Sequence, residues 1–441
     1  MAGLVSFPHG VHPNEHKETG KLPIARMPFV ERYVLPLSQH AGAPSKAVVT
    51  VGQQVVRGQL IAAPGGFIST SLHSPVTGKV VAVAPRRHPN GSFTDAIEIL
   101  ADAYSSQEPP RREPLAWKGF EHAQFVSAVQ QAGLVGLGGA AFPAHVKYSP
   151  PEGKKAKWLV INGCECEPYL TCDHRVMVER PEEIIRGVEI VAERLGVERS
   201  FIGVESNKED AVEALRKAAA HNPAIEVRSL QVKYPQGAEK MLIEALFKIE
   251  VPAGKLPIDI GIVVNNVSTM AALADWFDRG TPLVERVVTV AGPGVERPAN
   301  LIVPLGTPVR QVLEACGLRP ETRQVIMGGP MMGQPLASLD VPVIKGTSGL
   351  LAFTEVRELG NENACVKCGR CLDACANFLN PSRLARLSVA GRHEDLEKHF
   401  VMDCMECCAC SWVCPSGVPI VQLIRSAKAE IREAAQKKKN S

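Results

Sequence analysis

Two cysteine runs near the end of the chain constrain its fold more than any other feature. Each run has the spacing C-x₂-C-x₂-C-x₃-C; the first starts at Cys365 and the second at Cys404. This is the bacterial ferredoxin spacing, in which three thiolates converge from one tight loop and the fourth binds the other of two [4Fe–4S] clusters. The spacing therefore predicts two clusters, with these ligands: Cys365, Cys368, Cys371 and Cys414 for one, and Cys404, Cys407, Cys410 and Cys375 for the other.

Structural zinc is the alternative for these cysteines, because C-x₂-C pairs also build zinc ribbons. Zinc needs four ligands, which gives no reason for a four-cysteine run to occur twice. Cys408 adjoins Cys407, and spacing decides between them, because Cys407 preserves both two-residue gaps of its run and Cys408 breaks both. The runs favour an electron-transfer protein.

The composition bounds the class of protein. The chain has 441 residues, of which 45% are hydrophobic and 22% charged, as is ordinary for a globular protein of several domains. A net charge of +3 without a basic face argues against nucleic-acid binding. The 13 cysteines, with no recognisable signal peptide, favour metal-bound thiols in the cytoplasm. No apolar stretch approaches the roughly 18 residues of a membrane-spanning helix, so we expect membrane association through partners.

Changes along the chain predict four domains and a tail. Residues 1–108 have short alternating runs that resemble a barrel-sandwich (biotinyl/lipoyl-like) module without its modified lysine. Residues 115–285 alternate helical periods with apolar strands, which is typical of a parallel, Rossmann-like α/β sheet. We expect a β-grasp (SLBB-like) domain at 286–354, an α-helical two-cluster ferredoxin domain at 355–430 and a basic tail at 431–441. The predicted fold class is multidomain α/β and α+β.

Three stretches of the α/β domain indicate a ligand site. Residues 136–147 form a loop of small residues, which lets a backbone approach a phosphate or a flavin closely. The loop is neither a Walker A loop nor a Rossmann fingerprint. Residues 162–168 follow the predicted strand 158–161, and residues 265–269 follow the predicted strand 260–264. Open α/β sheets bind ligands at the carboxyl ends of their strands, so we expect one site there.

These stretches, in this order, resemble the flavin-carrying, NADH-oxidising subunit of respiratory complex I. With the flanking domains and the cysteine runs, residues 1–430 are similar to the C subunits of Rnf electron-transport complexes. The resemblance implies FMN, NAD(H) and two [4Fe–4S] clusters as cofactors. It implies integral and peripheral Rnf subunits as partners, and ferredoxin indirectly through one of them. It also implies a peripheral position on the cytoplasmic face of the bacterial inner membrane.

The resemblance assigns cofactor-binding roles but no general acid or nucleophile. The positions near the flavin and its phosphate are Gly136, Gly138 and Lys147, and the polar groups that bind the flavin are Asn162, Asn265, Asn266 and Thr269. Phe142 matches an aromatic residue that stacks on the nucleotide, and Tyr234 and Gly237 match the loop over the flavin. The acidic positions around the flavin and the nicotinamide are Glu165, Glu167 and Glu239. The chain departs from the complex I pattern at Leu137, Ala141, Cys164 and Ala238.

The implied function is electron transfer between NADH, FMN and the two clusters, to or from partner subunits of an ion-translocating NADH:ferredoxin-type oxidoreductase. Two alternatives stay open. One is a soluble flavin and iron–sulfur cobalamin reductase, although about 115 residues precede the glycine-rich loop here, an order that favours the Rnf family. The other is a non-catalytic, cluster-bearing docking subunit, which the departures at Leu137, Cys164 and Ala238 keep open.

Overall fold

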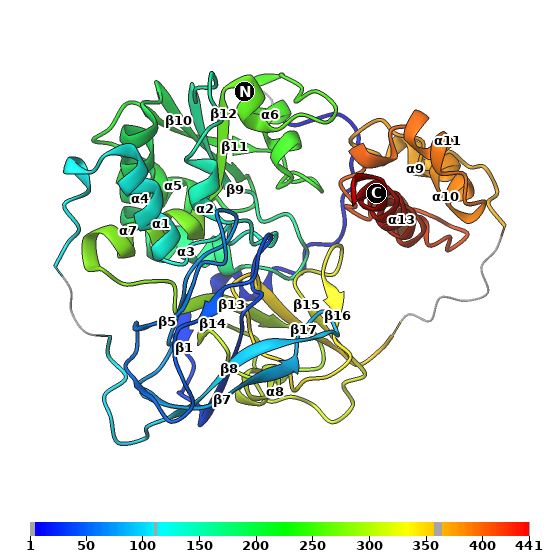
Figure 1. The fold of residues 1–441 in the computed structure, drawn as a ribbon. Helices are drawn as coiled ribbons and strands as arrows, with labels where there is room; N and C mark the ends of the chain where they lie inside the picture. The colour runs from blue at the N-terminus through cyan, green and yellow to red at the C-terminus, as the bar shows by residue number, and fades with distance from the viewer. Residues whose placement is uncertain (1–4, 110–112, 357–363, 441) are drawn as a thin grey trace.

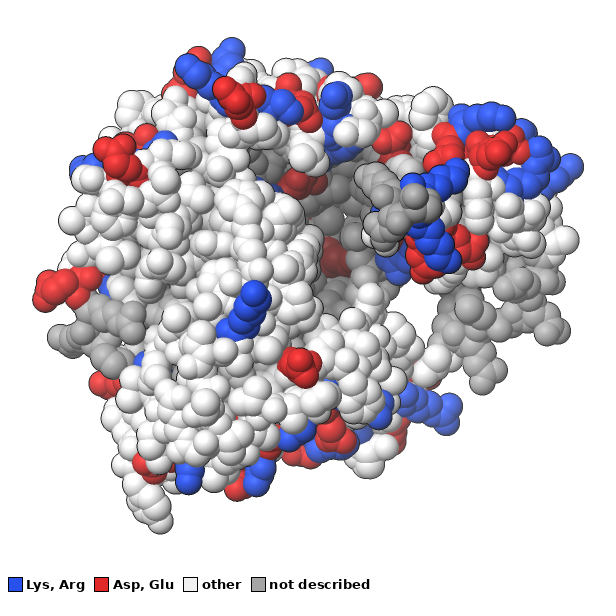
Figure 2. All heavy atoms as spheres, viewed as in Figure 1, with Lys and Arg blue, Asp and Glu red and all other residues white. Residues whose placement is uncertain are grey.

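The computed structural model describes residues 5–109, 113–356 and 364–440. In Figure 1 the α/β domain lies above the barrel-sandwich and β-grasp sheets, and the helical C-terminal domain lies beside them. Acidic and basic side chains are interspersed on the visible face, with no continuous basic surface (Figure 2). Within the described residues, none of the helices is long and apolar enough to cross a membrane.

The N-terminal domain is built from two small antiparallel sheets. Their orders are β2-β8-β7-β4 and β3-β5-β6. Alternate residues such as Tyr33, Leu35, Ile97 and Ile99 are fully buried between them, as the period of a strand requires. The strands are β2 (Arg32–Pro36), β3 (Lys46–Ala47), β4 (Gln54–Val55), β5 (Leu60–Ala63), β6 (Leu72–His73), β7 (Gly78–Arg87) and β8 (Phe93–Ala101).

The α/β domain has a parallel sheet in the order β11-β10-β9-β12. Its strands read as continuous apolar runs because helices cover both faces. Helices α4 and α7 approach so closely that a Cβ at Gly187 would lie 2.1 Å from the Met270 carbonyl oxygen. The elements are α1 (His122–Gln131), α2 (Ala144–Lys147), β9 (Trp158–Gly163), α3 (Cys172–Glu179), α4 (Pro181–Leu195), β10 (Arg199–Glu205), α5 (Glu209–Ala219), β11 (Ile225–Leu230), α6 (Glu239–Phe247), β12 (Ile262–Asn266) and α7 (Val267–Arg279).

The β-grasp domain has a sheet in the order β1-β14-β13-β17-β15-β16. Its edge strand β1 comes from the N-terminal region and pairs in parallel with β14, so that Ile24 lies opposite Asn300. The two regions are therefore joined by a shared sheet. The elements are β1 (Ile24–Arg26), β13 (Glu285–Ala291), β14 (Ala299–Pro304), α8 (Val309–Ala315), β15 (Gln324–Met327), β16 (Gln334–Pro335) and β17 (Gly349–Phe353).

The C-terminal domain packs short helices around a small core that includes Leu384, Leu396, Ile420 and Ile424. Helix α13 runs through the predicted basic tail, with Ile431 buried, because its apolar stripe continues past residue 430. The helices are α9 (Arg370–Asp373), α10 (Pro381–Val389), α11 (His393–Lys398), α12 (Ala409–Trp412) and α13 (Ile420–Asn440); 3₁₀ turns lie at Glu18–Lys21, Trp117–Gly119, Pro257–Ile260 and Val401–Asp403.

The predicted fold class is confirmed, because the chain combines a barrel-sandwich, a parallel α/β sheet, a β-grasp sheet and a helical domain. The domain boundaries stay predictions. Residues 109–114, between the first two predicted domains, lie partly outside the described residues, as do the first and last residues of the chain.

Lys345 joins three of these domains. Its fully buried Nζ donates to Thr70 Oγ1 at 3.1 Å and to the carbonyl oxygens of Ser71 and Gly133, both at 2.7 Å. Burial lowers the pKa of Lys345 to about 7, because the charged ammonium loses its hydration. The amine is therefore a structural link whose charge opposes burial.

This link predicts a pH dependence of stability. Between the folded pKa near 7 and the unfolded value of 10.5, the unfolded chain holds a proton that the folded chain has lost. The free energy of unfolding should therefore rise with pH across this window, by at most about 1.4 kcal/mol per pH unit. Urea unfolding of Lys345→Met should show a flatter rise than the wild type. Lys46→Met, at an exposed position, is the control, and an unchanged slope in Lys345→Met would contradict the prediction.

Candidate functional site

The glycine-rich loop lies directly over the start of α7. The Leu137 N–H donates to Thr269 Oγ1 at 3.0 Å, and Arg286 donates to the Leu137 carbonyl oxygen at 3.1 Å. A Cβ at Gly138 would lie 3.3 Å from Asn266 Nδ2, and Gly139 has a φ of +119°, which side-chain-bearing residues rarely adopt. The loop is thus held close to the helix N-terminus, where backbone N–H groups favour anions.

Two asparagines end the strand beneath this loop. The prediction that they follow a strand at 260–264 is wrong by two residues, because Gly261, at a φ of +75°, ends a 3₁₀ turn and β12 begins at Ile262. The Asn266 side chain caps α7 by accepting from the N–H groups of Ser268 and Thr269 at 2.9 and 3.3 Å. Its position therefore fixes the helix start.

Asn265 carries a free donor at the same strand end. Its Oδ1 accepts from the Tyr148 hydroxyl at 3.1 Å, whereas its buried Nδ2 has no hydrogen-bond partner among the described residues. Lys147 lies at the same strand, with its Nζ 2.8 Å from the Val264 carbonyl oxygen and 2.5 Å from Glu239 Oε1. An unsatisfied donor, a cation and a helix N-terminus together fit an anionic group such as the FMN phosphate.

The end of β9 is tied to the loop at 234–237. Asn162 Nδ2 donates to the Gly237 carbonyl oxygen at 2.7 Å, and the Gly237 N–H donates to Cys166 Sγ at 3.2 Å. A Cβ at Gly237 would lie 2.4 Å from the Cys164 carbonyl oxygen, so only glycine fits. The predicted residues Asn162 and Gly237 are thus in direct contact.

The Glu165 carboxylate points to the start of α3. It accepts from the N–H groups of Asp173 at 2.9 Å and His174 at 3.2 Å. Burial, followed by the charge of Glu165, raises the pKa of Asp173 to about 6. Asp173 in turn accepts from Asn266 Nδ2 at 2.7 Å, so this acid, which no spacing pattern indicates, supports the helix-capping asparagine.

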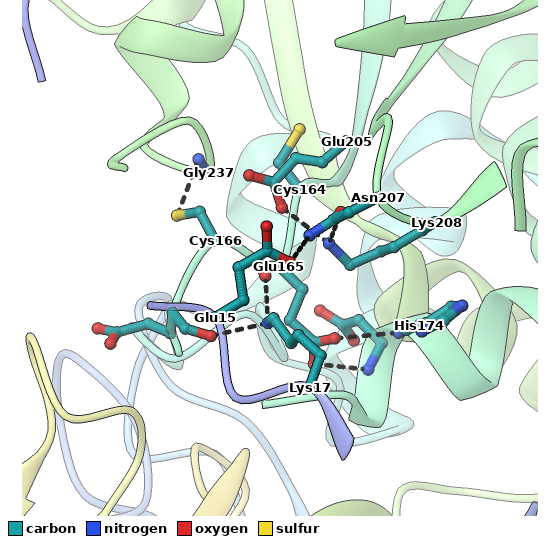
Figure 3. Close-up of polar contacts among 12 residues, drawn as sticks. Glu15, Lys17, Cys164, Glu165, Cys166, His174, Glu205, Asn207, Lys208 and Gly237 are labelled. Carbon is teal, nitrogen blue, oxygen red and sulfur yellow. Dashed lines mark hydrogen bonds and ion pairs between the residues drawn. The ribbon is translucent and has the colours of Figure 1, made fainter. Parts of the chain in front are cut away.

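Lys17 also escaped prediction, because a single lysine carries no motif. Its Nζ donates to the carbonyl oxygens of Glu165, Glu167 and Leu170 at 2.7, 2.8 and 2.5 Å, which fixes the segment after β9. Figure 3 shows Lys17 beside Glu165. Beside it, Lys208 Nζ donates to Glu205 Oε2 at 2.8 Å at the end of β10. Lys17 and Glu205 line the same pocket as Glu165 and Cys166.

The Glu167 carboxylate binds the β-grasp domain. It accepts from the N–H groups of Met331 and Met332 at 2.9 and 2.8 Å. A Cβ at Gly329 would lie 2.3 Å from Glu167 Oε2, so the turn approaches the acid through a glycine. Burial raises the pKa of Glu167. Its predicted role near the nicotinamide stays a prediction, while its observed contact joins two domains.

Tyr234 reaches the C-terminal domain. Its buried hydroxyl donates to the Cys407 carbonyl oxygen at 2.7 Å. The loop predicted to cover the flavin therefore also contacts a predicted cluster ligand.

Phe142 is half-buried at the end of the glycine-rich loop, where its carbonyl oxygen accepts from the Gly136 N–H at 2.8 Å.

One set of cysteines lines a common cavity. Its walls include Cys375, Cys404, Cys407 and Cys410, together with Cys408. Cys375 belongs to the first run, so the fold brings it to the three leading cysteines of the second. Within the described residues no three potential ligands converge closely enough to hold a single metal ion. A cubane spreads its thiolates over separate corners, which suits four cysteines around a cavity.

The other predicted set lies at the surface. Cys365 and Cys368 are exposed, whereas Cys371 and Cys414 are partly buried against the helical core. Away from both runs, Cys164, Cys172 and Cys316 are buried and Cys166 is partly buried. The residues present thus fit two iron–sulfur clusters and one flavin, and the individual ligand roles stay predictions.

Four family models match successive parts of the chain. They are the RnfC barrel sandwich hybrid domain at residues 5–104, the Nuo51 FMN-binding domain at 129–275, the SLBB domain at 287–335 and the 4Fe-4S dicluster domain at 364–419. Fold and site therefore define a flavin and iron–sulfur electron-transfer protein, which confirms the predicted FMN and [4Fe–4S] cofactors.

Curated relatives narrow this class. The chain is 41% identical to the C subunit of the proton-translocating ferredoxin:NAD(+) oxidoreductase complex of Clostridium ljungdahlii, covering 99% of this chain and 96% of the relative. It is 40% identical to the C subunit of the Na(+)-translocating complex of Acetobacterium woodii, covering 99% of each. For the C subunit of the ion-translocating oxidoreductase complex of Pseudomonas aeruginosa, identity is 40% over 99% of this chain and 57% of the relative. The chain belongs to this family, the C subunits of Rnf complexes.

A solved structure shares the fold. The H₂-reduced NAD⁺-reducing [NiFe]-hydrogenase aligns with a TM-score of 0.50 and 21% identity, over 71% of this chain and 62% of that one. At this identity the likeness shows common architecture alone. The predicted family is confirmed by the relatives, which cover nearly the whole chain.

Proposed function

We propose that this chain is the NADH-interacting electron-transfer subunit of a membrane-bound, ion-translocating oxidoreductase. It passes electrons between NADH, FMN and two [4Fe–4S] clusters, to or from partner subunits. Family membership supports a role within an oxidoreductase complex. The observation that carries the proposal is the contact of Tyr234 with Cys407, which joins the flavin loop to a cysteine run.

Bound FMN supplies the exchange of electron pairs with NADH and of single electrons with iron–sulfur clusters. The chain's own residues position these groups. Asn265 Nδ2, the start of α7 and Lys147 would hold the phosphate, and the glycine-rich loop would let the backbone approach the flavin closely. The hydrogen bond from Asn162 to the Gly237 carbonyl oxygen fixes the loop at 234–237 to the end of β9.

The proposed partners are the integral and peripheral subunits of an Rnf complex, with ferredoxin reached through one of them. The proposed location is peripheral, on the cytoplasmic face of the bacterial inner membrane. The relatives named as subunits of ion-translocating complexes support both proposals. None of the three relatives reported above is named as a cobalamin reductase, so that alternative gains no support.

A non-catalytic docking subunit is the second candidate. The carboxylates of Glu165 and Glu167 are engaged by backbone N–H groups, and Cys164 and Ala238 replace acids of the complex I pattern. These observations argue against NADH binding more than against flavin binding. The two candidates differ in whether NADH reduces the bound flavin.

Anaerobic purification followed by stopped-flow mixing with NADH tests the proposal. Flavin, iron and sulfide are quantified first, and flavin and cluster absorbance are then followed separately. We expect NADH to bleach the flavin before the clusters. A flavin that stays oxidised with NADH, while dithionite reduces the clusters normally, would support the docking subunit instead.

Asn265→Asp tests the phosphate site. The change keeps the side-chain shape but replaces the unpartnered donor by a negative charge facing the phosphate. Flavin affinity should fall by roughly a hundredfold or more, since a lost donor is combined with repulsion. Apo-protein titrated with FMN by fluorescence quenching measures this. Asn90→Asp, on an exposed turn, is the charge-matched control, and equal affinities in the two variants would contradict the assignment.

A further inference from the structure

Asp173 places a carboxylate at the start of α7, where the FMN phosphate is proposed to bind. Its Oδ2 accepts from Asn266 Nδ2 at 2.7 Å, and its Oδ1 accepts from Ser268 Oγ at 2.5 Å. Asn266 is the N-cap residue of α7, and Ser268 lies in the first turn of this helix. Asp173 is only 8% exposed. A buried acid therefore lies against the same helix N-terminus that favours a bound anion.

The same asparagine connects Asp173 with the glycine-rich loop. A Cβ at Gly138 would lie 3.3 Å from Asn266 Nδ2, which is the atom that donates to Asp173. Next to it in the chain, the buried Asn265 Nδ2 has no hydrogen-bond partner among the described residues and is free to donate to a ligand. One side chain thus lies in contact with both the acid and the loop of the proposed flavin site.

The groups around Asp173 oppose its ionisation more than they favour it. Burial, followed by the charge of Glu165, raises the pKa of Asp173 to about 6, although the bonds from Ser268 and Asn266 and the charge of Arg286 act in the other direction. The titratable and charged groups beside it are a second acid, a thiol, an arginine and a histidine paired with an aspartate on α5: Glu165, Cys172, Arg286, and His174 with Asp210.

We propose that Asp173 is a positioning residue for the FMN phosphate and takes up a proton when FMN binds. Two anions at one helix start repel each other, and an acid beside a second negative charge favours its neutral form. The carboxylate gains one proton from the solvent, and no other covalent bond forms or breaks. Ser268 Oγ can then accept from the protonated oxygen, because a hydroxyl serves as donor or acceptor. The inference rests on the proposed function, since it takes the start of α7 as the phosphate site.

FMN affinity should therefore depend on pH through Asp173. Above pH 6 the empty site holds an ionised acid that must gain a proton on binding, so the affinity should fall as the pH rises, by up to roughly tenfold per pH unit. Below pH 6 the acid is already protonated, and this fall ends. The phosphate of FMN has its own ionisation near pH 6, which is common to the wild type and every variant.

Calorimetric titration of the apo-protein with FMN, in buffers of different ionisation enthalpy, counts the protons taken up. At pH 8 we expect the wild type to take up roughly one proton more per FMN than Asp173→Asn, which should bind FMN roughly tenfold more tightly or better. Riboflavin, which lacks the phosphate, is the matched ligand and should show neither difference. Asp102→Asn, at an exposed position, is the control variant and should behave as the wild type.

A merely structural role for Asp173 gives a different result. If the acid only supports the Asn266 cap, Asp173→Asn changes the FMN affinity equally at pH 6 and pH 8, and its proton count equals that of the wild type. Either result would overturn the proposal, as would a wild-type proton uptake that riboflavin shares. Should Asp173→Asn not fold, the wild-type counts with FMN and riboflavin decide the question. Failure of FMN to bind the wild type at any pH would instead overturn the proposed function.

Discussion

Cys407→Ala is expected to remove one of the two clusters. Cys407 lines the cavity shared by Cys375, Cys404 and Cys410, and a cubane left with three thiolates is lost or degraded. Iron should fall from roughly eight to roughly four atoms per chain. Because Cys407 accepts a hydrogen bond from Tyr234 of the α/β domain, we expect the lost cluster to lie between the flavin and the remaining cluster, and reduction of the remaining cluster by NADH to slow by roughly a hundredfold or more. Iron and sulfide analysis and EPR after NADH measure both effects.

Cys408→Ala is the matched control for this change. Cys408 lines the same cavity, but its Sγ donates to the Glu406 carbonyl oxygen at 3.7 Å, and its backbone has a φ of +63°. We expect full iron content in this variant. Cluster loss in Cys408→Ala with retention in Cys407→Ala would show that the spacing argument selected the wrong neighbour.

Glu167→Ala is expected to destabilise the protein strongly. The change leaves the N–H groups of Met331, in a partly buried bond, and of Met332, in an exposed one, without their acceptor at a junction between two domains. The free energy of unfolding should fall by about 1–3 kcal/mol, because an unsatisfied buried donor costs about that much, whereas the exposed Met332 N–H can bind water instead. Urea unfolding measures the loss. Glu167→Gln, which keeps one carbonyl oxygen as acceptor, should recover part of it.

The same variant separates a structural role from a nucleotide-binding role. If the observed contact is the whole role of Glu167, folded Glu167→Ala keeps its flavin and its KM for NADH. Glu152→Ala, at an exposed loop position, should leave stability unchanged. A raised KM with unchanged stability would instead support the role near the nicotinamide that the resemblance implies.

Features carried by local spacing could be predicted. Short-range geometry connects three sequence patterns to structure. These patterns are the two cysteine runs, the small residues of the loop at 136–142 and the alternation of strands and helices. Even the crossed pairing of Cys375 with the second run follows from spacing, and the fold places Cys375 in the same cavity as Cys404. Errors at this level were small, such as the strand displaced by the turn at Gly261.

Contacts between distant segments could not be predicted. Glu167 lies 164 residues before Met331, and Lys17 lies 148 residues before the Glu165 carbonyl oxygen that it binds. A carboxylate can accept from a ligand, a helix start or a neighbouring turn, and sequence does not distinguish these partners. The structure alone shows that Glu165 caps α3 and that Glu167 holds the β-grasp turn.

The sequence by itself indicated two iron–sulfur clusters, because thiolate spacing is a local requirement of these groups, and its resemblance to the complex I subunit implied the flavin. Only the tertiary structure decided which cysteines face the flavin domain. That choice depends on the burial of Ala374 and Ala409 against Tyr234 and on the hydrogen bond from Tyr234 to Cys407. Such contacts arise from packing between domains, which no spacing within one run encodes.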